Sequence, residues 1–278
     1  MHPCLNPSLI STKELTGYLG VAQHAGFEWV EADIGDIRKR AEQTSPQEVV
    51  DLFASRGVQL ASFGLPVNLS GDEASFRDGL ARLDRNAGLA MMLGCGRCMT
   101  WLRPSVDALP VPYASRIAHR LRLCAEVLAA YGIRLGLEFV GPHHLRHKAY
   151  PFVYTINDTL EYIEGIGAPN IGLVVDSYHW YTTESSIADI ARIPAGRLVL
   201  VHVNDTDRSP AKADDHERLL PGEGRIDLTS FFRGLDQAVY NGPVSVEVLR
   251  KQPFAEPESE IAEKAFRAVA GLIEENRS

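Results

Sequence analysis

The sequence predicts a (β/α)8 barrel, and three observations lead to that prediction. The chain has 278 residues, which divide into eight units of about 35 residues each. Short apolar runs, many of them rich in β-branched residues, recur along the chain, and a glycine stands shortly before nearly every one. Amphipathic helical patterns fill the intervals, so that strand and helix alternate as they do around a closed parallel sheet.

Eight apolar runs have the length and composition of buried parallel strands. A glycine in the left-handed conformation commonly ends a helix, so each strand is expected to begin soon after such a residue. The glycines are Gly26, Gly57, Gly94, Gly132, Gly167, Gly196 and Gly242. The predicted strands cover residues 4–6, 27–30, 58–63, 95–102, 133–140, 171–175, 198–203 and 244–249.

Helical periodicity occupies the gaps between these runs. Ser11 with Glu14, and Ser45 with Glu48, have the spacing of capping boxes at helix starts. The amphipathic segments cover residues 72–93, 113–131, 155–166, 227–239 and 258–275, and a weaker pattern covers 187–193.

The domain organisation follows from the absence of any linker-like composition, so residues 1–278 are predicted to form one barrel domain. The competing fold is a doubly wound open sheet, which requires a glycine-rich phosphate turn after its first strand. The segment Asn6-Pro7-Ser8 is not such a turn. The barrel is therefore the favoured architecture.

Composition and charge exclude several classes of function. With 28 Lys and Arg against 36 Asp and Glu, the net charge is −8, whereas nucleic acids and anionic membranes bind basic surfaces. No apolar stretch reaches the roughly 18 residues of a membrane span, and the N-terminus does not resemble a signal peptide. Four cysteines do not form a disulfide framework. We expect a cytoplasmic protein with a small-molecule ligand, either monomeric or homo-oligomeric.

Four side chains of the kind that bind metal ions follow the last four predicted strands: Glu138, Asp176, His202 and Glu247. Active sites of this barrel lie at the carboxyl ends of strands, and neighbouring strands are about 4.8 Å apart. A buried carboxylate costs several kcal/mol unless it has a partner. The partner is either a shared divalent cation or, as the alternative, Arg or Lys at the rim. We predict one divalent ion, with Mn²⁺ as first candidate and Mg²⁺, Co²⁺ or Zn²⁺ as alternatives.

This set of side chains predicts proton transfer next to a carbonyl group. A divalent ion that chelates a carbonyl and the adjacent hydroxyl stabilises the ene-diolate left when the proton between them is removed. Glu138 and Glu247 are the predicted acid–base pair, and Asp176 and His202 are assigned as ligands only. The predicted reaction is isomerisation or epimerisation of a small polyhydroxylated ketone. The alternative is a dehydratase of the inosose or 3-dehydroshikimate type, in which a β-hydroxyl then departs.

Five motifs in the second half of the chain resemble the xylose-isomerase-like barrel superfamily. Within this superfamily the motifs resemble the sugar isomerase and epimerase branch most. In that branch they resemble the inosose isomerases more than the other enzymes. The N-terminal half matches only in its alternation of strands and helices. The motifs are Leu137-Glu-Phe-Val-Gly141, Gly172-Leu-Val-Val-Asp-Ser-Tyr-His179, Val201-His-Val-Asn-Asp-Thr206, Leu220-Pro-Gly-Glu-Gly-Arg-Ile-Asp227 and Pro243-Val-Ser-Val-Glu-Val248.

The resemblance implies roles for individual residues. It assigns the metal to the same four strand-end side chains named above and the acid–base roles to their two glutamates. It further implies that His179 and Arg208 hold substrate oxygens and that Glu223, in the loop at the rim, contacts the substrate. The alternatives are that His179 only orients Asp176 and that Arg208 is a solvated loop residue.

Residues after the second and fourth predicted strands are expected to line the opposite wall of the pocket. Glu31 and Asp33 end the second strand, and Trp101 with Arg103 ends the fourth. Trp101 is expected to offer an apolar face to a substrate ring. The alternative is that these residues form salt bridges at the rim.

Two weaker motifs remain. A basic loop directly after the fifth predicted strand contains His143, His144 and His147. It either covers the site and contacts a carboxylate or phosphate of the substrate, or it is a mobile solvated loop. Cys95 and Cys98 have the spacing of a redox pair but lie inside a predicted strand, so we interpret them as buried structural residues.

Two other functions are weighed against the isomerase. Type IV apurinic endonucleases belong to the same superfamily, and Asp214-Asp-His216 ahead of Gly222-Glu-Gly224 is loosely similar to part of their three-metal site. The third and fourth strands, however, end in Phe63-Gly-Leu-Pro66 and Trp101-Leu-Arg-Pro104, where those enzymes place histidine ligands. The negative net charge also disfavours DNA. A sugar-binding barrel without activity would predict a damaged ligand set, and here the set is intact.

Overall fold

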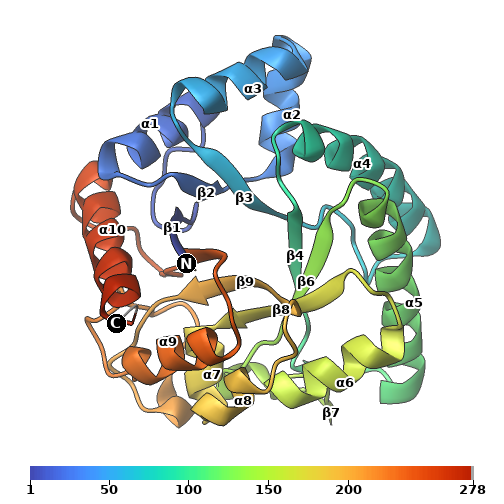
Figure 1. Ribbon diagram of the computed structural model, residues 1–278. Helices are drawn as coiled ribbons and strands as arrows, with labels where there is room; N and C mark the ends of the chain where they lie inside the picture. Colours follow the sequence, from blue (N-terminus) through green and yellow to red (C-terminus); the bar gives the residue numbers. More distant parts are fainter. Residues whose placement is uncertain (277–278) are drawn as a thin grey trace.

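Eight parallel strands form a closed barrel in the computed structural model, which describes residues 1–276 (Figure 1). They follow one another around the barrel in chain order, and the last strand pairs with the first. The predicted (β/α)8 fold is confirmed. The barrel strands are β1 (His2–Leu5), β2 (Trp29–Glu31), β3 (Gln59–Gly64), β4 (Arg97–Trp101), β6 (Arg134–Glu138), β8 (Ile171–Asp176), β9 (Leu198–Val203) and β10 (Pro243–Val246).

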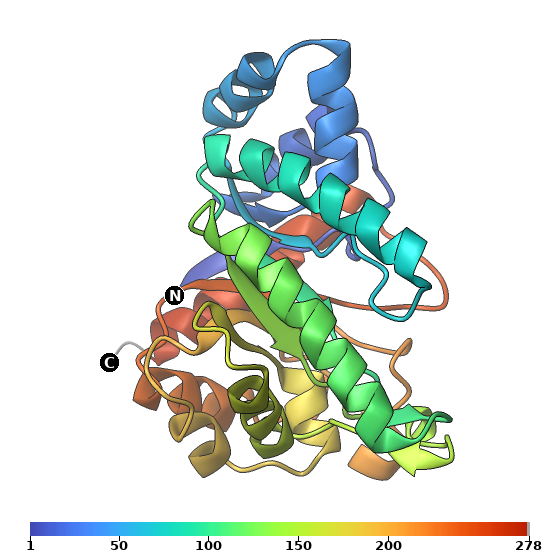
Figure 2. The same ribbon diagram turned by 90° about the vertical axis from the view of Figure 1, so that its right-hand side faces the viewer.

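Helices surround the strands in Figure 1, and Figure 2 shows α4 and α5 side by side on the outside. None of the helices within residues 1–276 is both long enough and apolar enough to cross a membrane. The helices are α1 (Leu15–Ala25), α2 (Ile34–Gln43), α3 (Pro46–Ser55), α4 (Glu73–Met92), α5 (Pro110–Ala129), α6 (Ile156–Ile166), α7 (Ser177–Thr182), α8 (Ile187–Ala191), α9 (Leu228–Gln237) and α10 (Glu258–Glu275).

Two short strands and two 3₁₀ turns, which are not part of the strand–helix alternation, lie near one end of the barrel. The strands β5 (Ser105–Val106) and β7 (Tyr150–Pro151) pair antiparallel outside the barrel. Short 3₁₀ turns form at η1 (His143–Leu145) and η2 (Pro210–Lys212). These segments follow the carboxyl ends of β4, β6 and β9, so they build up the side on which an active site of this fold is expected.

Strand burial matches the prediction of parallel strands covered on both faces in β8, β9 and β10, but not in β1 and β4, which contain exposed residues. Every residue of β8 and of β9 is buried, as expected when helices pack outside and side chains fill the barrel inside. Cys95 and Cys98 are buried, free thiols. Burial raises the pKa of the Cys95 thiol to about 11, which disfavours the reactive thiolate and agrees with a structural role.

The predicted helix starts were correct for α3 and wrong for α1. Ser45 accepts a hydrogen bond from the Glu48 N–H at 3.2 Å, as its capping box predicts. At α1 the cap is Glu14, not Ser11. The Ser11 N–H instead donates to the carboxylate of Glu258 at the start of α10, 2.6 Å away, and this distant partner draws Ser11 away from the helix.

Of the seven glycines predicted to end a helix before a strand, all but Gly242 have the left-handed conformation. Gly26 and the other predicted glycines have positive φ angles, but Gly242 does not. After α9 the left-handed residue is Val239, with φ of 56°, and its N–H donates to the Asp236 carbonyl at 2.9 Å. Gly242 has a different role, because a Cβ there would lie 2.6 Å from the Tyr240 hydroxyl. The prediction for Gly242 was therefore wrong.

Replacing Val239 with glycine is expected to stabilise the protein. A residue with a Cβ costs about 1–2 kcal/mol in the left-handed conformation, and the greater freedom of unfolded glycine returns part of that. Val239 is 76% exposed, so little burial is lost. We expect Val239→Gly to raise the free energy of unfolding by about 0.5–1 kcal/mol in urea denaturation. Val239→Ala, which retains the Cβ, should gain less; an equal gain would contradict the conformational explanation.

Candidate functional site

Four side chains from consecutive barrel strands meet at the carboxyl end of the barrel. Glu138 and Asp176 are the last residues of β6 and β8, His202 lies in β9, and Glu247 directly follows β10. One ligand-type atom from each lies within 4.8 Å of the corresponding atoms of the others. Asp176 is in register with His202 on the neighbouring strand. The four side chains that the strand ends predicted are thus close together in space.

The imidazole of His202 lies between carboxylates from opposite sides of the barrel. Its Nδ1 is 2.9 Å from Glu138 Oε1 and 3.6 Å from Glu247 Oε2, and its Nε2 is 3.0 Å from Glu31 Oε1. Burial alone would lower the pKa of His202, but these three carboxylates outweigh burial and hold the pKa well above its usual value. The three carboxylates therefore favour the protonated form of the ring, whose two nitrogens link Glu138 to Glu31.

Glu31 is also a member of this cluster. The sequence predicted that it lines the opposite wall of the pocket, but not that it contacts His202. It is 6% exposed, and besides His202 it accepts hydrogen bonds from Asn6 Nδ2 at 2.8 Å and Ser245 Oγ at 2.6 Å. It therefore holds one ring nitrogen of His202 from inside the barrel. Asp33, which was expected beside it, instead caps α2 through the Gly35 N–H at 2.7 Å.

Arg218 is the residue that the sequence did not reveal. Its guanidinium is almost completely buried and donates to Asp176 Oδ2 at 2.8 Å, to Glu247 Oε2 at 2.9 Å and to Asp215 Oδ1 at 2.7 Å. The alternative weighed above, in which an arginine neutralises these carboxylates, is therefore true for two of them. Arg218 lies in the connection after β9 and not at a strand end, so no strand-end pattern points to it.

The cluster carries an excess of negative charge. Even with His202 and Arg218 both positive, ionisation of all its carboxylates would leave three uncompensated negative charges. Burial raises the pKa of Glu247 to about 7, and it also raises the pKa of Glu138. The carboxylates concerned are Glu31, Glu138, Asp176, Asp215 and Glu247.

Asp176 is held in its ionised form. Burial favours the neutral carboxyl, but the Arg218 guanidinium outweighs burial and keeps the pKa of Asp176 well below its usual range. The carboxylate also accepts hydrogen bonds from the Tyr178 N–H at 2.7 Å and Asn204 Nδ2 at 2.9 Å. His179 Nε2 is 3.9 Å away, too far for a hydrogen bond. Asp176 is thus oriented by groups other than His179.

A cavity of about 480 Å³ opens above the cluster, which is a size typical of small-molecule sites. Glu138, Glu247 and Arg218 form part of its lining, and His179 and Trp101, two of the predicted substrate contacts, line it as well. Trp101 is 54% exposed, so its ring is open to a ligand.

The other two predicted substrate contacts, Arg208 and Glu223, do not line this cavity. Arg208 faces a neighbouring hollow and pairs with Asp207 at 3.3 Å. Glu223 is exposed, and its carboxylate accepts the Leu220 N–H at 3.3 Å. Contact of either residue with a substrate remains a prediction.

The loop around Glu223 is organised by a buried carboxylate. Asp205 accepts hydrogen bonds from the Gly222, Gly224 and Ile226 N–H groups at 2.9 to 3.1 Å. The Pro-Gly-Glu-Gly motif therefore has a structural explanation, because a Cβ at Gly224 would overlap the Asp205 carboxylate and the Thr206 carbonyl.

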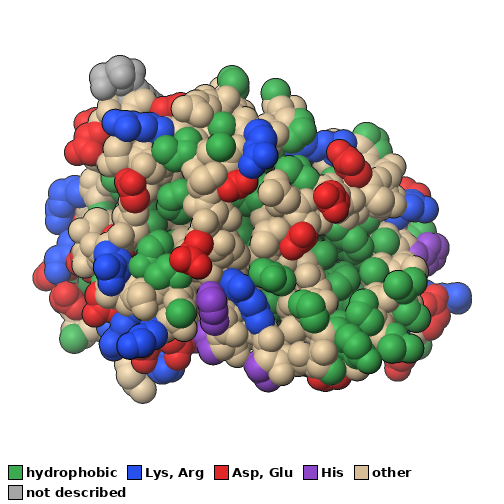
Figure 3. Space-filling view, turned by 90° about the horizontal axis from the view of Figure 1, so that it is seen from below, with side chains coloured by type: hydrophobic (Ala, Val, Ile, Leu, Met, Phe, Trp, Pro, Cys, Tyr) green, Lys and Arg blue, Asp and Glu red, His purple; other side chains and the backbone are tan. Residues whose placement is uncertain are grey.

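The basic loop after β6 contributes to the outer wall of the cavity. His147 and Lys148 line it, and Lys148 also pairs with Asp107 at 3.2 Å. His147 Nδ1 lies 2.8 Å from the His144 carbonyl, which leaves Nε2 for other contacts. On the face of the molecule in Figure 3, histidines gather beside Lys or Arg side chains. His147 and Lys148 thus line one part of the cavity, and the carboxylates Glu138 and Glu247 line another.

Comparisons with known proteins identify relatives of this chain. The family model of the xylose isomerase-like TIM barrel matches residues 19–271. An inosose isomerase of Halalkalibacterium halodurans is 32% identical over 129 residues, 46% of this chain and 44% of that enzyme, so the match spans less than half of the enzyme. A 3-dehydroshikimate dehydratase of Pseudomonas aeruginosa is 27% identical over 91% of this chain and 39% of that protein. A xylose isomerase domain protein from Alicyclobacillus acidocaldarius has a similar structure, with a TM-score of 0.97 and 42% identity over the whole of both chains.

Removal of Arg218 is expected to destabilise the metal-free protein strongly. Loss of one partner from a buried ion pair leaves an uncompensated charge and costs about 3–5 kcal/mol. We expect Arg218→Met to lose about that much in urea denaturation with EDTA present. Arg218→Lys, which retains a charge but not the planar fork, should lose less. Equal stability of Arg218→Met and the unmodified protein would show that the guanidinium does not hold the cluster together.

Proposed function

Because the chain belongs to the xylose isomerase-like TIM barrel family, we propose that it is a divalent-metal-dependent enzyme that isomerises or epimerises a small polyhydroxylated ketone. The observation that carries the proposal is the group of Glu138, Asp176, His202 and Glu247, whose ligand-type atoms lie within 4.8 Å of one another below a cavity. The inosose isomerase relative supports an isomerase.

The side chains of the cluster fit a divalent cation. Three carboxylates and an imidazole suit Mn²⁺, our first candidate, and also Mg²⁺, Co²⁺ or Zn²⁺. Because His202 must lose its proton to bind the ion, the double positive charge would offset a net one of the three excess negative charges. His202 has the arrangement usual for a metal-binding histidine, with Nδ1 toward the other ligands and Nε2 toward the Glu31 carboxylate. A bound cation would polarise the substrate carbonyl and stabilise the negative charge that develops as the neighbouring proton leaves.

The protein's own groups then move the proton. Glu138 and Glu247 approach from β6 and from the end of β10, and both line the cavity. In the proposed reaction one carboxylate removes the proton beside the carbonyl, and the other returns a proton at the new position or on the opposite face. Trp101 covers one side of the substrate and limits access of water, and His179 contacts a substrate oxygen.

A dehydratase is the second candidate, since the 3-dehydroshikimate dehydratase relative matches 91% of the chain. Its first step, removal of a proton next to a carbonyl, needs the same carboxylates. The two functions differ in whether a β-hydroxyl then leaves as water.

Deuterium exchange distinguishes these functions. Protein loaded with Mn²⁺ is incubated in D₂O with a panel of inososes and ketoses, and the recovered substrates are analysed by NMR. We expect deuterium at the carbon next to the carbonyl without loss of water. Loss of water with a new enone absorbance would instead identify the dehydratase, and a complete absence of exchange across the panel would contradict both.

Within the same assay, Glu247→Gln and Glu138→Gln are each expected to slow exchange at least about 100-fold, since general acid–base groups contribute that much or more. Glu164→Gln removes an exposed carboxylate on α6 and should leave the rate unchanged. Unchanged exchange in Glu247→Gln would disprove its assigned role.

Glu31→Gln tests whether Glu31 positions His202 as a ligand. Loss of the carboxylate partner of a metal-binding histidine typically weakens metal binding about 10–100-fold. We expect a drop of that size in Mn²⁺ affinity by isothermal titration calorimetry, with the fold checked by circular dichroism. The matched control is Glu28→Gln, an exposed glutamate next to the same strand. Equal affinities of Glu31→Gln and the control would rule out the positioning role.

A further inference from the structure

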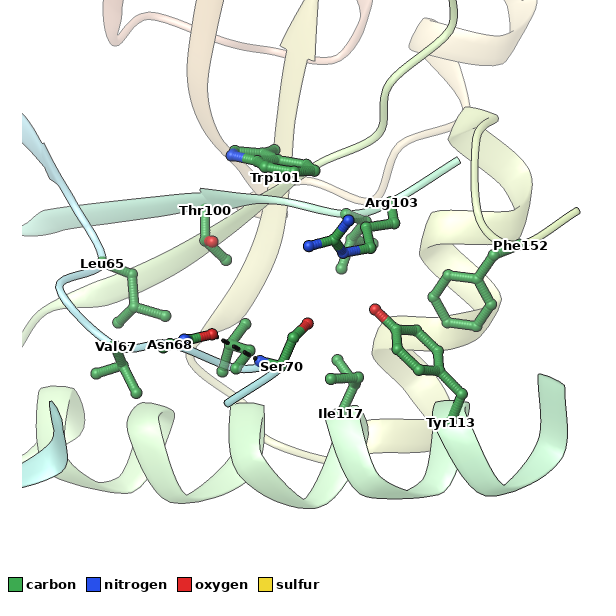
Figure 4. A pocket seen from close by; sticks show the side chains of 12 residues that line it. Leu65, Val67, Asn68, Ser70, Thr100, Trp101, Arg103, Tyr113, Ile117 and Phe152 are labelled. Atoms are coloured by element: carbon green, nitrogen blue, oxygen red, sulfur yellow. Dashed lines mark hydrogen bonds between the residues drawn. The ribbon is translucent and has the colours of Figure 1, made fainter. Parts of the chain in front are cut away.

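A second cavity, of about 220 Å³, shares Trp101 and Arg103 with the larger cavity above the acidic cluster. Figure 4 shows it between the end of β4, the loop after β3 and helix α5. Nothing in the proposed reaction uses this space. Because they share Trp101 and Arg103, the two cavities are adjacent.

Each polar side chain around the second cavity has a group that can donate a hydrogen bond. In Figure 4 the hydroxyl groups of Tyr113 and Ser70 point toward the space that the Arg103 guanidinium enters. The Asn68 Oδ1 already accepts the Ser70 N–H at 3.1 Å, which leaves the amide NH₂ of Asn68 as a donor. None of the side chains from residues 1–276 that line this cavity is acidic.

Arg103 lacks a counter-ion, in contrast to Lys148 nearby. Lys148 pairs with Asp107 at 3.2 Å. The Arg103 guanidinium lies over the Trp101 ring, 5.7 Å from its centroid, and forms no ion pair with any carboxylate of residues 1–276. A guanidinium that is held by an aromatic ring and has no carboxylate partner is well suited to bind an anionic ligand.

Tyr113 gives this cavity a rigid wall. It is 8% exposed, and its ring packs edge-to-face against Phe152 with centroids 5.2 Å apart. Its hydroxyl, which has no hydrogen-bond partner among residues 1–276, faces the cavity. Arg103, in the segment after β4, and Tyr113, in α5, thus offer two donors to one small ligand group.

We propose that Arg103 and Tyr113 form an anion subsite that holds a carboxylate or phosphate group of the substrate while its ketone end reaches the acidic cluster. This inference rests on the proposed function, because it names the substrate class of that site. His147 and Lys148 also line the larger cavity and add hydrogen-bond donors there, although Lys148 is paired with Asp107.

The first test measures anion binding without any turnover. Metal-free protein is titrated with inorganic phosphate and, separately, with propionate, and Trp fluorescence and calorimetry report binding. We expect saturable binding of at least one of them, weakened about tenfold or more in Arg103→Met and less in Tyr113→Phe. Arg85→Met removes an exposed arginine of α4 and should bind like the unmodified protein. Equal binding by Arg103→Met, or no binding of either anion, overturns the subsite.

The second test separates failure of the subsite from failure of the proposed function. Deuterium exchange is measured with neutral, carboxylated and phosphorylated polyhydroxy ketones. Arg103→Met should raise KM about tenfold or more for the anionic substrates and leave KM for neutral ones unchanged; whichever anionic series responds identifies the group. An equal change for neutral and anionic substrates overturns the anion subsite but leaves the proposed function intact. If no ketone exchanges, the proposed function fails, and the titration still decides the subsite.

Discussion

Carboxylates that share a buried space lose hydration and repel one another, so Glu138, Asp176 and Glu247 stay together in the barrel only where cations lie among them or where some of them carry a proton. Arg218 supplies one positive charge, with hydrogen bonds of 2.8 Å and 2.9 Å to two of these carboxylates. His202 supplies another between β6 and β2. The remaining excess of negative charge is the physical reason to expect a divalent cation.

One side of the barrel supplies the ligand-type side chains, and the opposite side supplies the carboxylate that holds His202. Four consecutive strands place ligand-type side chains at one end, and β2 contributes Glu31 from across the barrel to hold the far nitrogen of His202. The connection after β9 covers the cluster with Arg218, and Asp205 fixes the following loop. Because these supports are buried hydrogen bonds, the side chains are held in place before any ligand binds.

Sequence patterns predicted the features that depend on neighbouring residues. Each apolar run that ends in a carboxylate or imidazole indicates both a strand and a residue at its functional end, which is why Glu138 and Asp176 could be identified. Arg218 lies in a loop, and only the folded chain brings it to Asp176, 42 residues away. Ser11 likewise donates its N–H to Glu258, which is 247 residues away in the sequence, and does not cap the helix next to it. Local rules failed where a distant partner provided the stronger interaction.

The central claim is that the acidic cluster binds one divalent cation. Anomalous X-ray scattering near the manganese absorption edge, from crystals grown with saturating Mn²⁺, tests it most directly. The account predicts a single strong peak within bonding distance of Glu138, Asp176, His202 and Glu247, with Nδ1 of His202 toward the ion and Nε2 still beside Glu31. A map without a peak at this position, or with Mn²⁺ bound only elsewhere, would contradict it.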